Sequence, residues 1–481
     1  MNKRFAKIVG TLGPSSNDEG IVKKLILSGL DIARLNFSHG THAEHAERIR
    51  ILRKLSEELG KPVSILMDLQ GPKLRIGELP PEGLDLIAGQ FVLLSSSENH
   101  PLVEDQTIYI PFEVPDLHKA LKAGNHILLD DGHLEFEVLS VDGASIHAKV
   151  ILGGRLSSHK GVNLPGAQLE IPVLTEKDMK DLKFGLEQGV DAVAISFVKD
   201  ENDILHVRNT IKQLAPENSN IPIIAKMERP EAIYNMEKII QVTDGVMVAR
   251  GDMGVEMSPA RVPVVQKEII RSANRHAKIV ITATQMLDSM INNPRPTRAE
   301  AADIANAIFD GTDAVMLSGE TAAGKYPIES VQMMNSIVIE AEKHMGEWAH
   351  LDTFEQELKS DDGISITRAA KELAQDREVA GIVVFTQSGR TALWMSKAKP
   401  NVPIFAFTPV EETYFRMGLF WGVTPLLVPH ADTLETMIKH VETAITTTTT
   451  LTSGQQVVVI SGFPVGEFRT PNLALLYTIQ G

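Results

Sequence analysis

IPIIAKMERPEAIYNMEKIIQVTDGVMVARGDMGVEM, residues 221–257, holds two short apolar runs, and each run ends in charged residues. The first run leads to Lys226 and Glu228, and the second leads to Arg250 and Asp252. Side chains alternate between the two faces of a strand, so we expect Lys226 and Glu228 to point the same way. Two carboxylates beside an ammonium group suit Mg²⁺ together with a phosphate-bearing anion. A structural ion pair at the edge of a sheet is the alternative.

Apolar, β-branched runs of this kind recur along the chain and alternate with segments of helical period. Near-continuous apolar strands that alternate with helices indicate a parallel sheet covered by helices. Eight such runs predict a (β/α)₈ TIM barrel, a fold that places its chemistry at the carboxyl ends of its strands. The runs cover residues 7–11, 31–37, 63–68, 191–197, 221–227, 245–249, 279–284 and 313–318.

A long interruption follows the third run, and the helical pattern returns only at about residue 176. Within it, residues 126–152 alternate apolar and polar side chains and contain the pairs Asp131-Gly132 and Asp142-Gly143. Asp-Gly between alternating runs is a hairpin signal. We therefore predict a small inserted β-barrel domain.

The pattern of apolar runs and helical segments restarts after about residue 343, with runs at 379–386, 402–408 and 456–462. This restart predicts a third, α/β domain of ordinary size. The expected division is residues 1–70 with 169–343 for the barrel, 71–168 for the inserted β domain and 344–481 for the C-terminal α/β domain.

Composition and charge narrow the class of protein. A chain of 481 residues is long for one core, and about two to four domains are expected. The net charge of −15 argues against non-specific binding to nucleic acid or to an anionic membrane. The absence of cysteine excludes disulfides and cysteine nucleophiles. With no run of about 18 apolar residues and no signal-peptide pattern, we expect a cytoplasmic protein.

Candidate ligands also follow the second and third runs. Arg34, Asn36 and Ser38 alternate with apolar residues; an arginine suits a phosphate, and the other two offer neutral oxygens to a cation. Asp68, at the end of the third run, would complete an oxygen cage with Asn36 and Ser38. A capping cluster for the next helix is the alternative interpretation of the second run.

Three other features carry candidate chemistry. Thr284, at the end of the seventh run, is placed to donate or relay a proton. His39, His42 and His45 are spaced by three, but no second cluster supports a metal, so we expect ordinary solvated histidines. The stretch TQSGRTA, residues 386–392, joins a predicted strand to a helix, and its hydroxyls and arginine would form a phosphate cradle for a regulatory ligand.

Nine segments spread over essentially the whole chain together resemble pyruvate kinases. Several of them are long and specific, and their agreement in this order is not credible as chance. They read KIVGTLGPSS, GLDIARLNFSHG, LMDLQGPKLRIG, KGVNLPG, IIAKMERPEA, VMVARGDMGVE, ITATQMLDSM, NPRPTRAE and DGTDAVMLSGETAAGKYP.

The resemblance implies transfer of the phosphoryl group of phosphoenolpyruvate to ADP, which gives pyruvate and ATP in the final step of glycolysis. It implies Mg²⁺ or Mn²⁺ on Glu228 and Asp252, while Lys226 stabilises the migrating phosphoryl group and the enolate. It also implies an inserted domain that acts as a lid, a homotetramer, and a phosphorylated effector in the third domain, with a second effector segment near residues 462–469.

The resemblance assigns further residues by position. Arg34, Gly251, Asp252 and Thr284 would contact the substrate, with Thr284 near the proton delivered to the enolate. Nucleotide-contacting positions correspond to Asn36, His39, Arg75 and Lys160. The effector loop corresponds to Thr386, Gln387, Ser388, Gly389, Arg390 and Thr391.

One departure concerns potassium. Relatives that require it carry Thr-Lys-Gly-Pro-Glu where this chain has LQGPK at residues 69–73. Asn36, Ser38 and Asp68 match the potassium ligands of such relatives, but Leu69 has no hydroxyl and Lys73 places an ammonium where they have a carboxylate. We therefore expect activity that does not require K⁺.

Two other functions remain open from the residues alone. An Mg²⁺-dependent aldolase of the pyruvate-enolate type would use a similar barrel, but it would need neither a lid nor the phosphoryl contact of Lys226. A catalytically inactive metabolite sensor would need only the 386–392 site. Retention of Lys226, Glu228, Asp252, Arg34 and Thr284 together argues against the sensor.

Overall fold

Eight parallel strands close into a barrel, which confirms the fold predicted from the eight apolar runs. β1 completes the ring, because it pairs with β17 on one side and β2 on the other. Around the ring the strands are β1 (Lys7–Thr11), β17 (Ala314–Leu317), β16 (Ile279–Ala283), β15 (Gly245–Ala249), β14 (Ile223–Met227), β13 (Ala192–Ile195), β3 (Ser64–Asp68) and β2 (Ile32–Asn36).

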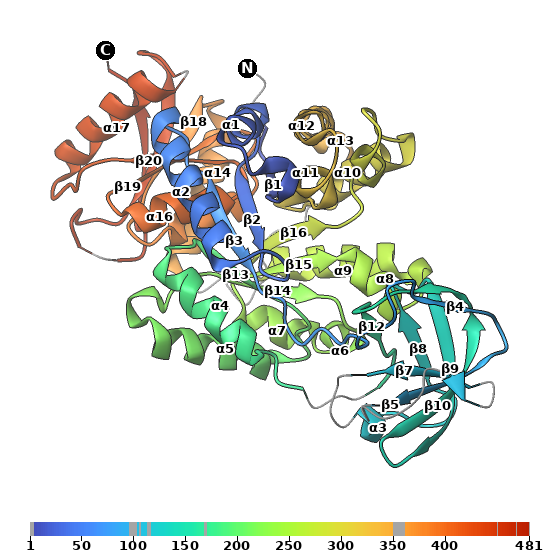
Figure 1. Cartoon of the computed structure of the whole chain (residues 1–481). Helices are drawn as coiled ribbons and strands as arrows, with labels where there is room; N and C mark the ends of the chain where they lie inside the picture. Colours follow the sequence, from blue (N-terminus) through green and yellow to red (C-terminus); the bar gives the residue numbers. More distant parts are fainter. Residues whose placement is uncertain are drawn as a thin grey trace.

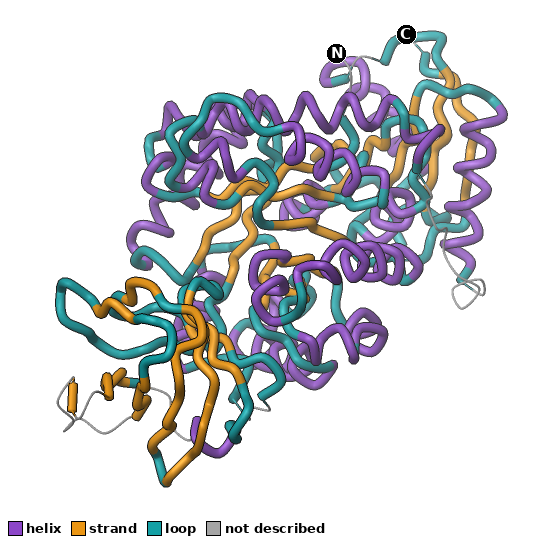
Figure 2. Tube along the Cα trace, turned by 90° about the vertical axis from the view of Figure 1, so that its right-hand side faces the viewer, coloured by secondary structure: helices purple, strands orange, loops and turns teal. Residues whose placement is uncertain are grey.

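The barrel lies between the inserted β domain and the C-terminal domain (Figure 1). The turned view in Figure 2 shows the same order, with both termini at the end of the molecule away from the inserted domain. The structure is a computed structural model, and it describes residues 4–95, 103–104, 107–112, 117–167, 171–349, 361–449, 451–467 and 469–480.

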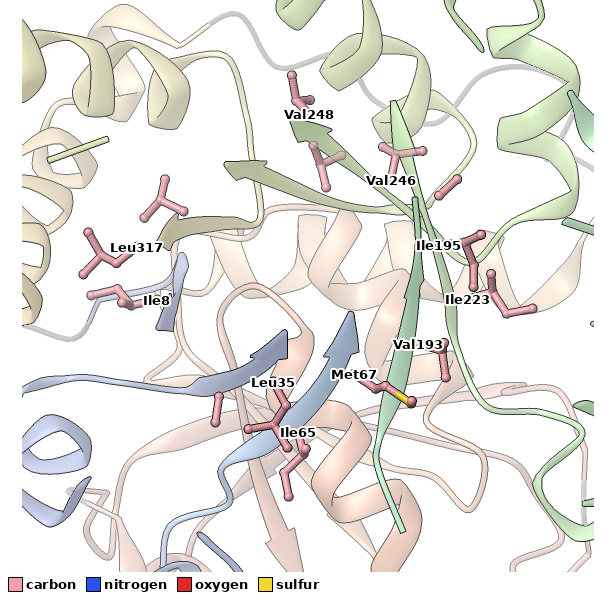
Figure 3. Packing of buried hydrophobic residues seen from close by; sticks show 14 of the residues in the cluster. Ile8, Leu35, Ile65, Met67, Val193, Ile195, Ile223, Val246, Val248 and Leu317 are labelled. Carbon is pink, nitrogen blue, oxygen red and sulfur yellow. The ribbon is translucent and has the colours of Figure 1, made fainter. Parts of the chain in front are cut away.

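Successive residues of a barrel strand belong to two different hydrophobic clusters. In β14, Ile224 packs inside the ring with Leu66 and Ile32. Its neighbours Ala225 and Met227 pack with the surrounding helices instead. Figure 3 shows part of this outer cluster, including Ile65, Met67 and Val246. Both faces of each strand are therefore buried, which is why the runs are almost wholly apolar.

The covering helices begin where the sequence supplies capping residues. Thr41, Thr175 and Thr297 each form a capping box, which satisfies backbone N–H groups that a helix start would leave unpaired. The helices of this part of the chain are α1 (Glu19–Ser28), α2 (His42–Leu59), α4 (Glu176–Glu187), α5 (Glu201–Leu214), α6 (Pro230–Tyr234), α7 (Met236–Val242), α8 (Arg250–Glu256), α9 (Val262–Arg275), α10 (Arg298–Phe309), α11 (Gly319–Ala322), α12 (Pro327–Lys343) and α13 (Met345–Trp348).

The interruption after β3 is a β domain with its own hydrophobic core. Both predicted hairpins are confirmed, because β9 pairs antiparallel with β8 and with β10. Gly132 and Gly143 supply the positive φ that these turns need, at 85° and 55°. The elements are β4 (Leu84–Leu86), β5 (Phe91–Ser95), β6 (Val103–Glu104), β7 (Thr107–Pro111), α3 (Leu117–Ala120), β8 (His126–Leu129), β9 (Leu134–Asp142), β10 (Ser145–Leu152), β11 (Gly154–Leu156) and β12 (Val162–Asn163).

The C-terminal domain is a five-stranded sheet in the order β20-β19-β18-β21-β22. The three predicted runs form β18 (Gly381–Phe385), β19 (Ile404–Thr408) and β21 (Gln456–Ser461). The sequence analysis missed the two edge strands, β20 (Val423–Leu427) and β22 (Leu473–Thr478). Pro425 interrupts the first. The second, LALLYT, does have an apolar run, which was not recognised as a strand, and it is only half-buried. The helices are α14 (Asp362–Asp376), α15 (Arg390–Lys397), α16 (Glu411–Arg416) and α17 (Leu434–Thr448).

Charged side chains join the barrel to the C-terminal domain at the amino ends of the barrel strands. Asp313, just before β17, pairs with Lys397 at 2.5 Å and with Lys399 at 2.6 Å, and all three side chains are buried. The Nζ of Lys7 donates to the carbonyl of Val423 at 2.7 Å. The C-terminal domain thus covers the end of the barrel opposite to the one where chemistry is expected.

Within the described ranges, no helix combines the length and the apolar composition that a membrane span requires.

Candidate active site

Two barrel strands, β14 and β3, continue their inward-facing residues into a cluster of charges. The inward set of β14 runs from Ile224 to Lys226 and on to Glu228, and that of β3 ends in Asp68. The Lys226 Nζ lies 2.7 Å from the Glu228 Oε1 and 3.5 Å from the Asp68 Oδ1, and it donates a hydrogen bond of 2.8 Å to the Ser196 Oγ. Burial lowers the pKa of Lys226, but the surrounding carboxylates raise it to a net value above the usual range. The ammonium group is therefore held fixed and charged.

Arg34 adds a second fixed cation beside this cluster. It lies on the inward face of β2, and its Nε donates to the Asp68 Oδ2 at 2.7 Å. One of its terminal nitrogens donates to the Thr11 Oγ1 at 3.0 Å. Burial raises the pKa of Asp68, but Lys226 and Arg34 lower it to a net value below the usual range. A single carboxylate thus sets the positions of both cations.

Glu228 is fully buried, and one of its carboxylate oxygens accepts no hydrogen bond from the described residues. Its Oε2 accepts a hydrogen bond of 2.9 Å from the backbone N–H of Phe197. Its Oε1 lies close to Lys226, but outside hydrogen-bonding geometry, and has no other partner among the described residues. Burial raises the pKa of Glu228 to about 7, with the carboxylate of Asp252 acting in the same direction and Lys226 opposing it.

These features fit a divalent cation. Asp252 lies in the first turn of α8 and acts electrostatically on both Lys226 and Glu228. A buried carboxylate oxygen without a hydrogen bond, near a second carboxylate, is a donor set that suits a hard ion such as Mg²⁺ or Mn²⁺. Glu228 and Asp252 are the residues that would hold it.

Thr284 is held in a backbone conformation that a β-branched residue rarely adopts, with φ at 67°. Two guanidinium nitrogens of Arg250 fix this turn, by donating to the carbonyls of Ala283 at 3.2 Å and of Thr284 at 2.7 Å. A third nitrogen of Arg250 pairs with Asp303 at 2.5 Å. The Thr284 Oγ1 accepts from the N–H of Gly251 at 2.7 Å, so the first turn of α8 and the end of β16 are joined.

Three residues that organise the site were given no role from the sequence. Ser196 continues the inward set of β13, and that alternation could have identified it. Phe197 supplies its N–H to Glu228 from a positive φ of 58°, a conformation that no sequence pattern signals. Arg250 was noted only as a charge at the end of a strand, whereas the structure places it as a clamp on Thr284.

The residues expected at the nucleotide lie on two domains. Asn36 ends β2 and His39 follows it, whereas Arg75 and Lys160 lie where the chain enters and leaves the inserted domain. Burial, with the positive charges of Arg75 and Lys73, lowers the pKa of His39, so these groups lie near one another. Lys160 does not join them, because its Nζ pairs with Asp130 of the inserted domain at 2.6 Å.

The expected oxygen cage for potassium is only partly assembled. Asn36 and Asp68 are paired in register on adjacent strands. The Asn36 Oδ1, however, accepts a hydrogen bond of 3.1 Å from the backbone N–H of Ser38, and Asp68 is occupied by Arg34. The side chain of Lys73 lies against Gly161 of the inserted domain.

The expectation of solvated histidines at the start of α2 is wrong for His45. Its side chain is 1% exposed, its Nε2 lies 3.0 Å from the carbonyl of His39, and its ring stacks on Phe37 at 4.1 Å. His42 pairs with Asp181 at 2.7 Å and stacks on Phe184. The spacing of three placed these rings on the inner side of the helix, where packing rather than solvent surrounds them. No group of three or more metal-ligating side chains occurs in the part of the chain that the structure describes.

The TQSGRTA stretch lies beside a cavity of about 250 Å³ in the C-terminal domain. Gly389, with φ at 81°, donates its N–H to the Thr386 Oγ1 at 3.0 Å, which shapes the loop at the start of α15. The Arg390 guanidinium stands 4.4 Å above the ring of Trp394. The opposite wall includes Gly462 and Arg469, so the two expected effector segments line one cavity. Within the TQSGRTA stretch, Gln387, Ser388 and Thr391 also line the cavity.

Comparison with known proteins agrees along nearly the whole chain. Residues 3–331 match the family model described as pyruvate kinase, barrel domain, and residues 364–476 match pyruvate kinase, alpha/beta domain. A pyruvate kinase of Agrobacterium vitis is 43% identical over 473 residues, which are 98% of this chain and 98% of that protein. Pyruvate kinases of Staphylococcus aureus (strain MRSA252) and Sporosarcina psychrophila are each 42% identical, over 99% of this chain and 80% of their own length.

Proposed function

The chain belongs to the pyruvate kinase family, and we propose that its barrel site transfers the phosphoryl group of phosphoenolpyruvate to ADP. The observation that carries the proposal is the position of Lys226. Its ammonium group is buried among Asp68, Glu228 and Asp252, beside Arg34, at the carboxyl ends of the barrel strands. Phosphoryl transfer depends on positioning and on neutralisation of charge, and this cluster provides both.

Arg34 and Lys226 have different roles toward the negative charge of the substrate: Arg34 binds the phosphate, and Lys226 stabilises the charge that develops during transfer. The Arg34 guanidinium, held by Asp68 and Thr11, orients its remaining N–H groups toward a phosphate. Lys226 then stabilises charge as the phosphoryl group moves and as the enolate forms. Both cations are already in place before substrate arrives, so little reorganisation accompanies the reaction.

Glu228 and Asp252 hold the divalent cation, Mg²⁺ or Mn²⁺, in this proposal. When bound, the ion supplies charge neutralisation at the phosphoryl and carboxylate oxygens of the substrate. The hydrogen bond from Phe197 fixes the Glu228 Oε2 and leaves its Oε1 available. Gly251 and Asp252, in the first turn of α8, contact the substrate from the same side.

Thr284 delivers or relays the proton that the enolate gains when it becomes pyruvate. Its hydroxyl is positioned by the N–H of Gly251 and lies against the first turn of α8, which also carries Asp252. The clamp of Arg250 on the Thr284 carbonyl keeps this hydroxyl at one position. Thr284 therefore delivers or relays the proton while Arg250 acts as a positioning residue.

ADP is proposed to lie between the barrel and the inserted domain. Asn36 and His39 contact it from the barrel, and Arg75 and Lys160 contact it from the inserted domain. Movement of that domain would bring Lys160 from Asp130 to the nucleotide phosphates and exclude water from the transfer. The proposed domain division is residues 1–70 with 169–343 for the barrel, 71–168 for the inserted domain and 344–481 for the C-terminal domain. Residues 168–170, at one boundary, lie outside the described residues.

We propose that Lys73 replaces the monovalent cation. Its ammonium group is near enough to His39 to lower the pKa of that imidazole, and it has no ion pair among the described residues. Leu69, at the position where potassium-requiring relatives have a threonine, is 1% exposed and offers only carbon atoms. In this proposal the Lys73 ammonium group supplies the charge that a bound K⁺ would otherwise contribute.

A phosphorylated effector is proposed for the cavity beside residues 386–391. Arg390 and Arg469 line it together with the hydroxyls of Thr386, Ser388 and Thr391, a set that suits a phosphate. We also propose a homotetramer. An open apolar hollow over α10, α12 and α13, with Trp348 65% exposed, is a candidate contact between copies.

The test is an assay of pyruvate formation coupled to lactate dehydrogenase. Phosphoenolpyruvate, ADP and Mg²⁺ together should give NADH oxidation, and omission of ADP should abolish it. Pyruvate formation from phosphoenolpyruvate that does not depend on ADP would reject the kinase, because the phosphoryl group would then go to water. Pyruvate formed only by cleavage of a 4-hydroxy-2-oxo acid would favour the aldolase type of chemistry. No turnover at all, from a folded protein with a filled effector cavity, would favour a sensor.

A further inference from the structure

A second cavity, of about 710 Å³, lies between the barrel and the C-terminal domain. Its barrel wall comes from the end of α2 and from residues 189–191, immediately before β13. Its other wall comes from α16 and from Leu427 at the end of β20. Residues 189–191 precede their strand, so this cavity is at the opposite end of the barrel from Lys226. It is also separate from the cavity beside residues 386–391, since the two share no lining residue.

The cavity has one fixed wall at the junction of the two domains. The Arg53 guanidinium of α2 lies 3.9 Å above the ring of Phe415 in α16. The same guanidinium donates to the carbonyl of Gly189 at 2.7 Å and pairs with Asp191 at 2.8 Å. The Ser64 hydroxyl donates to the Phe415 carbonyl at 2.7 Å. Both domains are therefore held to the wall by specific contacts.

Arg416 lines this cavity, and its charge is only partly compensated, through the more distant carboxylates of Asp191 and Glu412. Its Nε is buried and has no hydrogen-bond partner, and within the described ranges no carboxylate lies close enough to form an ion pair with it. The nearby Asp191 acts on Arg416 only electrostatically; its Oδ1 pairs with Arg53, and its Oδ2 accepts the N–H of Ile65 at 2.7 Å. Burial lowers the pKa of Arg416, and the carboxylates of Asp191 and Glu412 oppose that shift without cancelling it. A buried, charged donor left unpaired is costly, and an anion bound to the guanidinium would reduce that cost.

The exposed rim of the cavity has the opposite character. Glu57, Glu411 and Glu412 line it, and no ion pair of these three carboxylates occurs in the described part of the chain. Tyr414, whose hydroxyl has no partner among the described residues, also lines the cavity. A ligand that fills the cavity would place an anionic end inward and hydrogen-bond donors outward.

We propose that this cavity is a further ligand site, which binds a small metabolite through one oxyanion on Arg416 and through hydroxyl or ammonium donors on Glu57, Glu411 and Glu412. A hydroxylated phosphate and an α-amino acid share this chemistry. Because the site joins α2 to α16, its occupant contacts both the barrel and the C-terminal domain.

Isothermal titration calorimetry of the full chain tests the proposal with three probes: inorganic phosphate, glycerol 3-phosphate and L-threonine. At least one of the last two should bind the wild type, and Arg416→Gln should weaken it at least about tenfold, the loss expected for hydrogen bonds to a charged group. The matched control is Arg390→Gln, which removes an arginine from the other cavity and should leave this binding unchanged.

The probes distinguish the two ligand sources. Glycerol 3-phosphate with competition by inorganic phosphate indicates a phosphate ligand, and L-threonine without such competition indicates an amino acid. Glu411→Gln with Glu412→Gln should weaken the donor-bearing probe and spare inorganic phosphate. Circular dichroism establishes that each variant is folded, and Arg416→Lys, which keeps the charge, should bind with intermediate affinity.

Two results would overturn the proposal. One is that neither glycerol 3-phosphate nor L-threonine binds the wild type at concentrations up to about ten millimolar, where a site of this kind should be filled. The other is binding that Arg390→Gln abolishes and Arg416→Gln leaves unchanged, because that result assigns the ligand to the cavity beside residues 386–391.

Discussion

Arg34 and Lys226, from strands on opposite sides of β3 and β13, are both held by the carboxylate of Asp68, at 2.7 Å and 3.5 Å. One buried anion thus fixes the separation of the two cations that would bind the substrate. Neither cation needs to move when an anionic substrate enters, and the site is electrostatically prepared for it.

Replacement of Lys226 by methionine should lower kcat by about 10²- to 10³-fold, the range for loss of one preorganised electrostatic contact in a transition state. Methionine keeps most of the volume, so the barrel should stay folded. The coupled assay measures the rate. Lys183→Met, at an exposed position of α4, is the matched control and should be silent. A near-normal rate for Lys226→Met would remove this residue from the mechanism.

Replacement of Arg250 by lysine should lower kcat/KM for phosphoenolpyruvate roughly tenfold, because an ammonium group cannot hold the carbonyls of Ala283 and Thr284 and also pair with Asp303. Steady-state kinetics measures the effect. Arg50→Lys, on the exposed face of α2, serves as control. Should the two variants behave alike, Arg250 does not position Thr284.

Glu342 should make stability fall as pH rises from about 5 to 7. Burial raises the pKa of Glu342 to about 7, although its oxygens accept the N–H groups of Phe5 and Ala6. A carboxyl whose folded-state pKa exceeds its unfolded value contributes stability below the unfolded pKa and loses it as pH rises through the folded pKa. Thermal melts across this window should show a steeper loss for the wild type than for Glu342→Gln. Equal slopes for the two proteins would contradict the expectation.

Replacement of Gly245 by alanine should destabilise the barrel by about 1–3 kcal/mol through overpacking. A Cβ there would lie 2.9 Å from the backbone oxygen of Ile279 and 2.7 Å from a methyl of Ile224. Urea denaturation measures the change in the free energy of unfolding. Gly346→Ala, where a Cβ would meet open space, is the control and should cost nothing.

Replacement of Lys73 by glutamate, together with Leu69→Thr, should make activity depend on K⁺. The exchange removes the fixed ammonium group and restores the carboxylate and the hydroxyl of potassium-requiring relatives. Initial rates with and without K⁺, in buffers free of other monovalent metal ions, give the activation ratio. The wild type should show a ratio near one, and strong activation of the wild type by K⁺ would refute the role of Lys73.

Much of the fold was predictable because each barrel strand is buried on both faces and so leaves a continuous apolar run. The site was predictable for Lys226, Glu228 and Asp68, which continue the inward alternation of their strands. Other features depend on tertiary contacts that no run or spacing encodes. A proline interrupts the apolar run of the edge strand β20, and Phe197 contributes only a backbone N–H. The unpaired Nε of Arg416 is visible only in the folded chain.

The alternation in β14 also has an evolutionary consequence. Ile224, Lys226 and Glu228 share one side of the strand, while Ala225 and Met227 fill the helix side. Loss or gain of one residue within this strand would point the Met227 side chain toward the reaction centre. It would also force the Lys226 ammonium group between the strand and the covering helices. Insertions should therefore be tolerated in the loops around the barrel but selected against in its strands. A shift of one residue would place apolar side chains in the active site and charged side chains in the hydrophobic core.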